Sequence, residues 1–293
     1  MLSELIRAMR PIQWVKNVFV FAPLVFGLRL LDPTSLGLAS VSFLLFCLVS
    51  SAVYLLNDLV DREKDALHPT KRFRPIAAGT LPVDVAKSAL AFILISTLIG
   101  GVLFDWRVGL VLFSYFGLNA GYSLQLKRWA FIDIACIAAG FMLRVVAGGV
   151  AIDVPLSGWL LACTFLLAMF LALGKRKHEM MAVDQKNPDV STREVLKRYR
   201  MKHVDFVLRL LAVVVVFTYA AYTLSDITVS QFGTHALVYS VPFVMVGIWR
   251  YLAIVDKHSE AQSPTDTMVK DITFILNVAI WAVVVTAIIY FNT

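Results

Sequence analysis

The sequence contains few charged residues for its length. Asp, Glu, Lys and Arg make up 16% of the 293 residues, whereas hydrophobic residues make up 59%, and the mean hydropathy is +0.77. Soluble domains contain about 25% charged residues, and a soluble fold of this size cannot keep so much apolar surface away from water. The composition therefore excludes a disordered chain, a collagen-like chain and an ordinary cytosolic enzyme, and it predicts a polytopic membrane protein.

Cysteine and histidine are also scarce. The three cysteines, Cys47, Cys136 and Cys163, lie in apolar runs without the spacing of metal ligands, which excludes a disulfide framework. The five histidines are scattered, and the sequence has no zinc spacing, nucleophile elbow, glycine-rich phosphate loop or haem pattern. The net charge of +7 indicates basic cytoplasmic loops rather than nucleic-acid binding in a chain of this class.

Nine apolar runs are each close to the length of about 20 residues that spans a bilayer. They cover residues 14–31, 35–56, 83–104, 108–124, 131–151, 157–174, 204–225, 235–255 and 271–291. Backbone polar groups must be satisfied within lipid, so the runs are helices, and the alternating pattern of a closed barrel is absent. We expect an all-α fold with nine transmembrane helices in a single domain over residues 1–293. The first and fourth runs are short, and we expect them to be tilted or partly re-entrant.

The basic residues predict the orientation of these helices. Of the 27 Lys and Arg residues, 22 fall in alternate loops if the N-terminus is cytoplasmic, and only two fall in the opposite loops. This asymmetry predicts a cytoplasmic N-terminus and an external C-terminus. The inner loops at 57–82, 125–130 and 175–203 are therefore the predicted active-site loops, because long charged loops in compact membrane domains usually carry function.

An acidic motif directly follows the second apolar run and consists of Asn57, Asp58, Asp61 and Asp65. If the helix continues through it, the three aspartates lie on one face at i, i+3 and i+7, with Asn57 one turn before Asp61. Such a stripe of like charges is favourable when it binds a cation, and hard oxygen ligands suit Mg²⁺, which bridges carboxylates to substrate phosphates. We predict that all four residues bind Mg²⁺, that the aspartates are catalytic and that Asn57 also contacts substrate. The alternative is a solvated helix end.

A basic segment lies just downstream of the acidic motif. Pro69 and Pro75 break the helix, and Lys71, Arg72 and Arg74 place three cations within four residues. Arginine donates planar, bidentate hydrogen bonds to phosphate, and lysine supplies a point charge. We predict that these three residues bind substrate phosphate; the alternative is that they only set the membrane orientation.

A second polar motif flanks the inner loop 125–130, which joins the fourth apolar run to the fifth. Tyr122 and Lys127 precede Asp133, which begins the fifth run at its inner end, and Arg144 lies on the same helix face as Asp133. A charge inside an apolar helix is costly and marks a functional site by default. We predict that Asp133 is catalytic and that the other three bind substrate. A structural pair of Arg144 with Asp153, or a snorkelling side chain, is the alternative.

Two further basic segments complete the set of candidates. Lys175 and Arg176 end the sixth run and open a loop that holds nine cations, more than topology or a helix dipole requires. Lys16 and Asn17 lie beside Trp14, an ordinary interfacial anchor. We predict that these four residues contact an anionic substrate or headgroup.

These features together resemble the UbiA superfamily of intramembrane prenyltransferases over essentially the whole chain. The resemblance rests on the nine helices, on Asn-Asp-x-x-Asp-x-x-x-Asp at 57–65 and on Tyr122, Lys127 and Asp133. The segments 10–17 (Arg-Pro-x-Gln-Trp-x-Lys-Asn), 68–75 (His-Pro-Thr-Lys-Arg-Phe-Arg-Pro) and 122–127 resemble the decaprenyl-phosphate phosphoribosyltransferase branch. Aromatic prenyltransferases of the superfamily carry an Asp four residues after the first in the second motif, whereas this sequence has Ile137, which weakens a second metal site.

The resemblance implies a Mg²⁺-dependent enzyme of the plasma (inner) membrane whose active site faces the cytoplasm. The enzyme transfers 5-phosphoribose from phosphoribosyl pyrophosphate (PRPP) to a polyprenyl phosphate, releases pyrophosphate and supplies arabinose donors for cell-wall polymers. Its partners are these substrates and membrane lipids, with no nucleic acid. The length of the lipid and the presence of a homo-oligomer stay open.

Two other functions are compatible with parts of this pattern. A UbiA-type prenyltransferase would move a polyprenyl chain from its diphosphate to an aromatic acceptor, and it predicts the second paired Asp motif that is missing here. A transporter with an acidic cation site predicts matching broken helices in two halves of the chain, a symmetry that the sequence does not display.

Overall fold

A computed structural model describes residues 1–186, 196, 198–256, 267–268 and 270–291. All regular elements within these ranges are helical, as the sequence predicts. The chain divides into two compact units, of which the first covers Met1–Leu156 and the second begins at Ser157.

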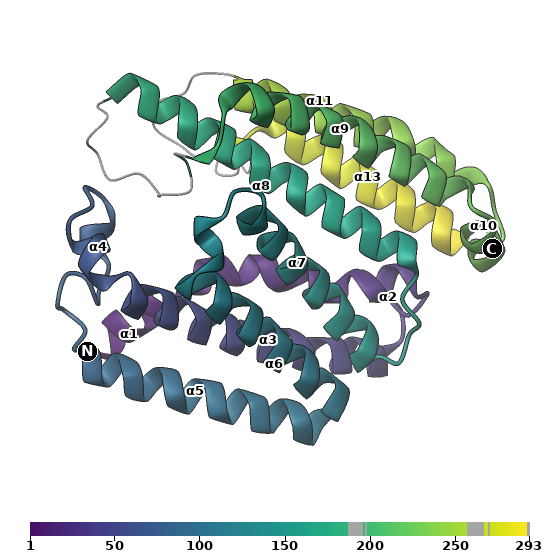
Figure 1. Cartoon of the computed structure of the whole chain (residues 1–293). Helices are drawn as coiled ribbons and strands as arrows, with labels where there is room; N and C mark the ends of the chain where they lie inside the picture. The colour runs from purple at the N-terminus through teal and green to yellow at the C-terminus, as the bar shows by residue number, and fades with distance from the viewer. Residues whose placement is uncertain (187–195, 197, 257–266, 269, 292–293) are drawn as a thin grey trace. The chain divides into compact units, whose positions relative to one another are not determined.

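The first unit is built around four long helices that lie side by side (Figure 1), with a shorter N-terminal segment packed against them. The long helices are α3 (Pro33–Val60), α5 (Val83–Phe104), α6 (Trp106–Leu124) and α7 (Ile132–Ala151). The shorter elements are α1 (Leu2–Met9), the 3₁₀ helix η1 (Pro11–Phe21), α2 (Ala22–Phe26), α4 (Arg62–Ala66), η2 (Lys71–Phe73) and η3 (Leu126–Arg128).

Helix starts in this unit follow from local capping. The Asp32 carboxylate accepts hydrogen bonds from the backbone N–H groups of Thr34 and Ser35 at the start of α3, and Pro33 occupies the first helical position, where no N–H is needed. Hydrogen bonds from the Ser35 hydroxyl and the Thr34 amide lower the pKa of Asp32. Asp105 caps α6 in the same way, through the N–H of Arg107 at 2.7 Å.

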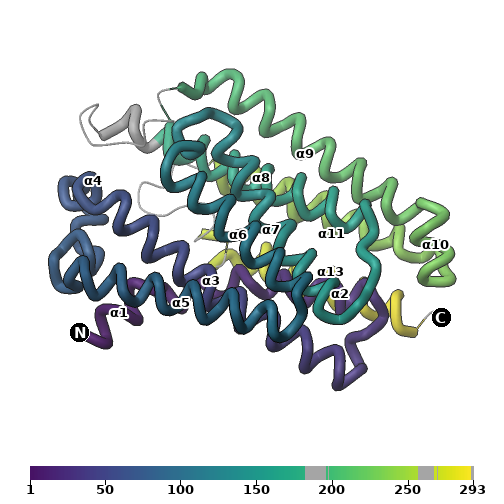
Figure 2. The backbone as a smooth tube through the Cα atoms, turned by 60° about the horizontal axis from the view of Figure 1, so that its bottom comes forward, coloured from purple at the N-terminus to yellow at the C-terminus, as the bar shows by residue number. Residues whose placement is uncertain are grey.

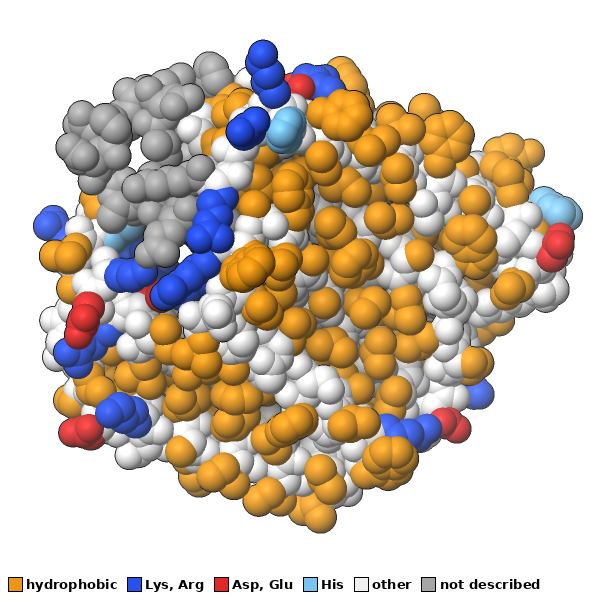
Figure 3. All heavy atoms as spheres, viewed as in Figure 1, with side chains coloured by type: hydrophobic (Ala, Val, Ile, Leu, Met, Phe, Trp, Pro, Cys, Tyr) orange, Lys and Arg blue, Asp and Glu red, His pale blue; other side chains and the backbone are white. Residues whose placement is uncertain are grey.

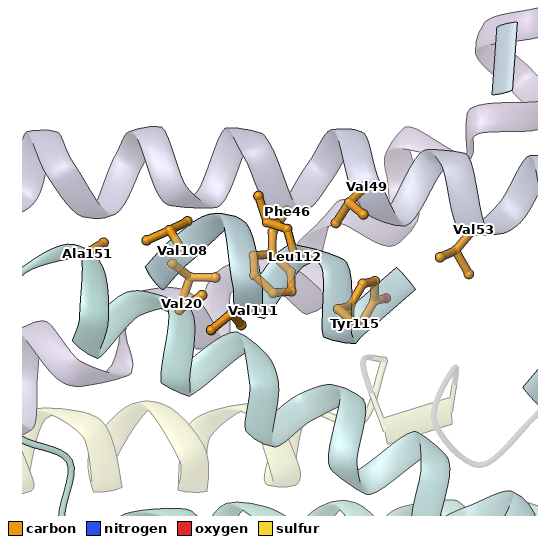
Figure 4. Packing of buried hydrophobic residues seen from close by; sticks show 10 residues of the cluster. Val20, Phe46, Val49, Val53, Val108, Val111, Leu112, Tyr115 and Ala151 are labelled. Carbon is orange, nitrogen blue, oxygen red and sulfur yellow. The ribbon is translucent and has the colours of Figure 1, made fainter. Parts of the chain in front are cut away.

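The core of the first unit lies where η1, α3, α6 and α7 meet (Figure 4). Phe46 of α3 is fully buried and its ring lies 5.2 Å from the ring of Tyr115 of α6. The buried cluster consists of Val20, Phe46, Val49, Val53, Val108, Val111, Leu112, Tyr115, Ala147 and Ala151. This packing fixes the N-terminal segment against the long helices that carry the acidic motif.

The second unit is a bundle in which α8 (Gly158–Lys186), α9 (Met201–Leu224), α11 (Val241–Asp256) and α13 (Ile272–Phe291) are neighbours (Figure 2). The short elements α10 (Asp226–Phe232) and η5 (Ala236–Ser240) connect α9 to α11. Two tyrosines join the helices within this unit. Tyr219 of α9 hydrogen-bonds to Ser240 and Trp281, and the Tyr251 hydroxyl donates to the carbonyl of Leu171.

Large apolar side chains cover much of the outer surface. Phe92 of α5 is 74% exposed, and Phe113, Phe217 and Val283 are similarly exposed on three other long helices. On the face drawn in Figure 3, hydrophobic side chains occupy most of the surface, and charged side chains lie mainly toward its edges. This is the surface that a bilayer covers, since soluble monomers rarely expose apolar patches of this extent.

Seven helices of the described chain are long and apolar enough to cross a membrane, against nine predicted runs. They are Pro33–Val60, Val83–Phe104, Ile132–Ala151, Gly158–Met181, Met201–Leu224, Ala236–Asp256 and Ile272–Phe291. The two remaining runs are those expected to be short. The first forms the shorter apolar stretch Pro11–Phe26, and the fourth forms α6, a helix of 19 residues.

The first predicted run differs most from the expected α-helix. Residues Pro11–Phe21 form a 3₁₀ helix of 11 residues, although such helices rarely exceed three or four residues without support. Support comes from close packing, because a Cβ atom on Gly148 of α7 would lie only 1.9 Å from the carbonyl oxygen of Val20. Only glycine allows α7 to approach the backbone of η1 this closely.

Candidate active site

The acidic motif lies at the end of α3, and its conformation differs in one respect from the prediction. We expected one helix to run through all three aspartates, but α3 ends at Val60, Asp61 leaves helical geometry at φ −92° and ψ 5°, and α4 begins at Arg62. The three aspartates therefore do not lie on one continuous α-helix. Asp58 and Asp65, which are 2% and 3% exposed, nevertheless come together.

Asp58 and Asp65 converge on one arginine. The Nη1 atom of Arg74 lies 3.2 Å from Oδ1 of Asp58 and 2.5 Å from Oδ2 of Asp65. Of the three cations in the basic segment, Arg74 thus contacts the acidic motif directly. A cation therefore already occupies the space between the two buried carboxylates in the protein alone.

A second arginine reaches the same carboxylate from the N-terminal segment. The Nη2 atom of Arg10 lies 2.5 Å from Oδ1 of Asp58, and its guanidinium stacks over the ring of Tyr54 at 4.9 Å. Arg10 adopts a left-handed conformation (φ 56°) between α1 and η1, which costs about 1–2 kcal/mol for a non-glycine residue. Its two contacts offset part of that strain.

These residues surround a polar pocket of about 290 Å³. The pocket is lined by Arg7, Arg10, Asp58, Thr70, Phe73, Arg74 and Pro75. Arg7 is fixed at its rim by a hydrogen bond of 3.2 Å from Nη2 to the carbonyl of Phe73. Lys71 and Arg72 are not part of the lining; Arg72 is exposed and stacks on the ring of Phe73 at 4.8 Å.

The two polar motifs predicted from the sequence meet at the C-terminal end of α3. The Nζ atom of Lys127 in η3 lies 2.6 and 2.7 Å from the two carboxylate oxygens of Asp61. Ser123 of α6 donates to Oδ1 of Asn57 at 3.2 Å. Asp133 is fully buried in the first turn of α7, the helix that packs against η3. Tyr122, one residue before Ser123, is half-buried.

Arg144 is 5% exposed to solvent and lies in a buried polar network. Its Nε atom donates to Oδ1 of Asn17 at 2.8 Å, Nη1 donates to the carbonyl of Gly140 at 2.9 Å, and Nη2 donates to the hydroxyl of Tyr115 at 2.8 Å. Two of these partners come from other elements, η1 and α6, and one from α7 itself. The alternative partner, Asp153, instead pairs with Arg107 at 2.9 Å.

Asn17 is the centre of this network and is fully buried. Besides accepting from Arg144, its Nδ2 atom donates to the Ser50 hydroxyl at 3.2 Å and to the Cys47 sulfur at 3.4 Å. Lys16, the neighbouring candidate, is exposed. Asn17 thus ties η1 to both α3 and α7.

The candidates Lys175 and Arg176 belong to the second unit, at the basic end of α8. Arg176 is 2% exposed and forms an ion pair of 2.9 Å with Glu179. The adjacent Lys177 lies 2.5 Å from Asp205 and 2.6 Å from Asp256, which links α8 to α9 and α11. Much of the following predicted active-site loop, 187–195 and 197, lies outside the described residues.

The donor set at the end of α3 fits Mg²⁺ that is bound jointly with a phosphorylated substrate. Within the described ranges, no three His, Cys, Asp or Glu side chains are grouped so that they could hold a metal by themselves. Magnesium, however, is usually bound by one or two carboxylates together with substrate phosphates. Asp58 and Asp65 supply two hard oxygen ligands around a site that attracts a cation, as the position of Arg74 demonstrates.

The sequence analysis did not name three residues that lie in or beside the pocket in the structure. Arg7 and Arg10 line it, and Tyr54 stacks under Arg10. Arg10 begins the segment 10–17 on which part of the family resemblance rests, and that membership was the signal available in the sequence. No pattern in the sequence indicated Tyr54, which lies within an apolar run.

Comparison with known proteins places this geometry in a family context. Residues 18–277 match the family model described as the UbiA prenyltransferase family. The chain is 33% identical over 303 residues to decaprenyl-phosphate phosphoribosyltransferase of Mycolicibacterium smegmatis, covering 100% of this chain and 94% of that protein. It is 36% identical over 294 residues to the protein of the same name from Corynebacterium glutamicum, covering 98% and 86%.

Solved structures agree with the fold. A UbiA homolog from Archaeoglobus fulgidus bound to DMAPP and Mg²⁺ superposes with a TM-score of 0.74 at 18% identity, and the match covers 98% of this chain and 99% of that protein.

Proposed function

The chain belongs to the UbiA prenyltransferase family, and from that premise we propose that it transfers 5-phosphoribose from PRPP to a polyprenyl phosphate and releases pyrophosphate. The observation that carries this proposal is the arginine-rich pocket around Asp58 at the end of a long apolar helix. A pocket with three arginines suits a donor that bears phosphates at two positions. The full-length similarity to relatives named decaprenyl-phosphate phosphoribosyltransferase supports the same donor and acceptor.

The acidic motif would bind the leaving group together with a metal. Asp58 and Asp65 would hold Mg²⁺, with Asp61 and Asn57 as the further ligands predicted from the sequence. When bound, the ion supplies positive charge to the pyrophosphate that leaves from C1 of the ribose. Arg74, which lies between the two buried carboxylates, would move onto a phosphate oxygen and remain within the same charge cluster.

The transfer step needs no general base. A phosphate monoester has a second pKa of about 6, so the acceptor is largely a dianion at neutral pH. One of its oxygens forms a bond to C1 of the ribose, and the bond between C1 and the pyrophosphate oxygen breaks with its electron pair going to pyrophosphate. A carboxylate from Asp65 or Asp133 would stabilise the oxocarbenium-like centre between these events.

The remaining candidate residues fall into two proposed roles. One group would contact substrate phosphates or lipid headgroups; it consists of Lys16, Lys71, Arg72, Tyr122, Lys127, Lys175 and Arg176. Asn17 and Arg144 would act by positioning, because both are buried and both polar atoms of the Asn17 side chain already have partners in the protein. Their network fixes η1, the element that directly follows Arg10.

We propose the finer topology on the same basis. Together with α6 and Pro11–Phe26, the seven long apolar helices would give nine spans, a cytoplasmic N-terminus and an external C-terminus. Residues 1–293 would then form one functional domain in the plasma membrane, with the acidic pocket on the cytoplasmic side. The positive residues of the inner loops support this orientation.

A single assay tests the proposed activity. Purified protein is incubated with labelled PRPP, a polyprenyl phosphate and Mg²⁺, and the lipid phase is extracted. We expect labelled lipid that requires both substrates and disappears with EDTA. Label that stays in the aqueous phase under all conditions would contradict the proposal, and transfer of a prenyl chain from its diphosphate to an aromatic acceptor would support the alternative activity.

A further inference from the structure

The N-terminal segment contributes two arginines to the pocket, although neither lies near the acidic motif in sequence. Arg10 contacts Asp58 directly, and Arg7 lines the pocket from its rim. Lys71 and Arg72, the cations expected from the sequence to bind phosphate beside Arg74, do not line it. The pocket therefore draws its positive charge from the start of the chain as well as from the loop after α4.

The arginines of the pocket share few acceptors. Its lining holds Arg7, Arg10 and Arg74 and one carboxylate, Asp58, whose Oδ1 accepts from both Arg10 and Arg74. Arg74 also pairs with Asp65 and Arg7 with Glu4, whereas Arg10 shares its acceptor atom with Arg74. Arg10 donates one N–H to Asp58, and the planar face of its guanidinium stacks on the ring of Tyr54. Among the described residues the other N–H donors of its guanidinium have no protein acceptor, so they are available to an anion.

The three arginines differ in how they contact the acidic motif. Arg74 touches both Asp58 and Asp65, the carboxylates suited to a metal, whereas Arg10 touches only Asp58. Arg7 touches neither of these carboxylates; its partners are the Phe73 carbonyl and Glu4 at 3.7 Å. Contact with the metal carboxylates therefore decreases from Arg74 through Arg10 to Arg7.

We propose that Arg10 and Arg7 bind the phosphate monoester of a sugar phosphate donor whose metal-bound pyrophosphate lies at Asp58, Asp65 and Arg74. This inference rests on the proposed function and extends it to two residues of the N-terminal segment. Arginine matches the tetrahedral phosphate with planar, paired N–H donors. Arg10 exchanges one hydrogen bond to Asp58 for bonds to the phosphate when the metal and pyrophosphate reach that carboxylate.

The N-terminal segment is held firmly enough to present these side chains. Ala8 of α1 is buried in a cluster with Leu55 and Ile76. Ser51 donates to the carbonyl of Met9 at 3.2 Å and accepts from the Trp14 indole at 3.1 Å. Arg10 lies between these anchors, so little conformational entropy is lost when it binds an anion.

The test separates the two ends of the donor by using each as a probe. Ribose 5-phosphate in EDTA reports on the monoester end, and pyrophosphate with Mg²⁺ reports on the metal end; both are titrated calorimetrically into detergent-solubilised full-length protein. The variants are Arg10→Ala, Arg10→Lys and Arg7→Ala. The matched control is Arg62→Ala, an exposed arginine of α4 outside the pocket lining.

We expect Arg10→Ala to raise the Kd for ribose 5-phosphate about tenfold or more, with a smaller rise for Arg7→Ala and an intermediate one for Arg10→Lys. The Kd for magnesium pyrophosphate should change less than threefold in each variant, and Arg62→Ala should match the wild type for both probes. If Arg10→Ala does not fold, Arg7→Ala decides the test, since Arg7 is 61% exposed and its loss should not impair folding.

Three results would overturn the inference. They are a wild type that does not bind ribose 5-phosphate, an Arg10→Ala or Arg7→Ala variant that binds it within twofold of wild type, and an equal loss of both probes. Turnover of PRPP into lipid by the wild type is measured separately. Failure of the arginine assignment therefore leaves the proposed activity standing, and failure of that turnover is recognised on its own.

Discussion

Replacing Asn17 with alanine should destabilise the protein strongly, because the side chain joins three elements around a buried charge. Asn17 accepts from Arg144 at 2.8 Å and donates to Ser50 and Cys47. Hydrogen bonds to charged groups contribute about 1.5–3 kcal/mol and neutral ones about 0.5–1.5 kcal/mol. Within the described first unit the hydrogen-bond partners of Arg144 are all neutral. Because the Asn17 oxygen accepts from the Nε–H of Arg144, its removal would leave that N–H buried without an acceptor.

We therefore expect Asn17→Ala to lower the free energy of unfolding by about 3 kcal/mol. For chains of roughly this size each kcal/mol lowers Tm by about 2–4 °C, so the expected fall is about 6–12 °C. Tryptophan fluorescence during a thermal ramp in detergent measures it, using the six tryptophans of the chain. Asn17→Asp should recover much of the loss, because it restores an acceptor and adds an opposite charge.

Asn119→Ala is the matched control. Asn119 of α6 is half-buried, and its side chain donates only to the carbonyl of Tyr115 one turn earlier. Its loss should lower Tm by less than about 4 °C. If Asn17→Ala lies within 2 °C of wild type, or falls no further than Asn119→Ala, the polar network around Arg144 does not stabilise the first unit and the reasoning is refuted.

The other predictions concern the pocket and the helix packing. Asp58→Asn and Asp61→Asn should each lower kcat about 100-fold or more at saturating Mg²⁺ while the protein remains folded, as measured by lipid extraction and size-exclusion chromatography. Arg74→Ala should raise the KM for PRPP about tenfold and the KM for the lipid less. Gly148→Ala should lower stability by about 1–3 kcal/mol, because the new Cβ atom would lie 1.9 Å from the Val20 carbonyl oxygen.

The aspartate variants and the glycine variant have controls within the same chain. Asp84→Asn changes an exposed carboxylate in the first turn of α5, and it should keep wild-type kinetics. Gly117→Ala introduces a Cβ atom with no heavy atom within 4 Å, so Tm should stay level or rise. Full activity in Asp58→Asn, equal KM effects in Arg74→Ala, or an unchanged Tm in Gly148→Ala would contradict the corresponding prediction.

The fold followed from the sequence wherever one strong signal acted alone. Long apolar runs predict helices because lipid leaves backbone polar groups no other partner, and seven of those runs are long apolar helices in the structure. The first run contains Asn17, whose side chain donates a hydrogen bond to Ser50 and accepts one from Arg144. Tertiary contacts of this kind, rather than hydropathy, explain why the segment adopts a 3₁₀ conformation, and a pattern of apolar residues cannot encode them.

The site was predictable where its residues are close in sequence. Spacing within the acidic motif brought Asp58 and Asp65 to the same place despite the break at Asp61, and Arg74 follows nine residues after Asp65. Pairs distant in sequence were identified only as separate motifs. Lys127 lies 66 residues from its partner Asp61, and single-sequence spacing says nothing about which loops meet.

Arg10 illustrates a third situation. Its role depends on a left-handed backbone conformation between two helices and on the stacking of its guanidinium over Tyr54. Neither feature has a signal in the sequence. The Pro11 that follows restricts Arg10, but it favours extended geometry there rather than the left-handed conformation that Arg10 adopts. The structure was needed to bring the start of the chain to the acidic motif.

The most direct test of the proposed chemistry follows the two ends of PRPP separately. PRPP labelled with ³²P either in its 5-phosphate or in its pyrophosphate group is incubated with purified protein, polyprenyl phosphate and Mg²⁺, and both phases are counted. If the bond at C1 breaks and phosphoribose is transferred, the 5-phosphate label enters the lipid and the pyrophosphate label stays in water in equal molar amount. Transfer of the pyrophosphate label to lipid, or no lipid label from either substrate, would contradict phosphoribosyl transfer by this protein.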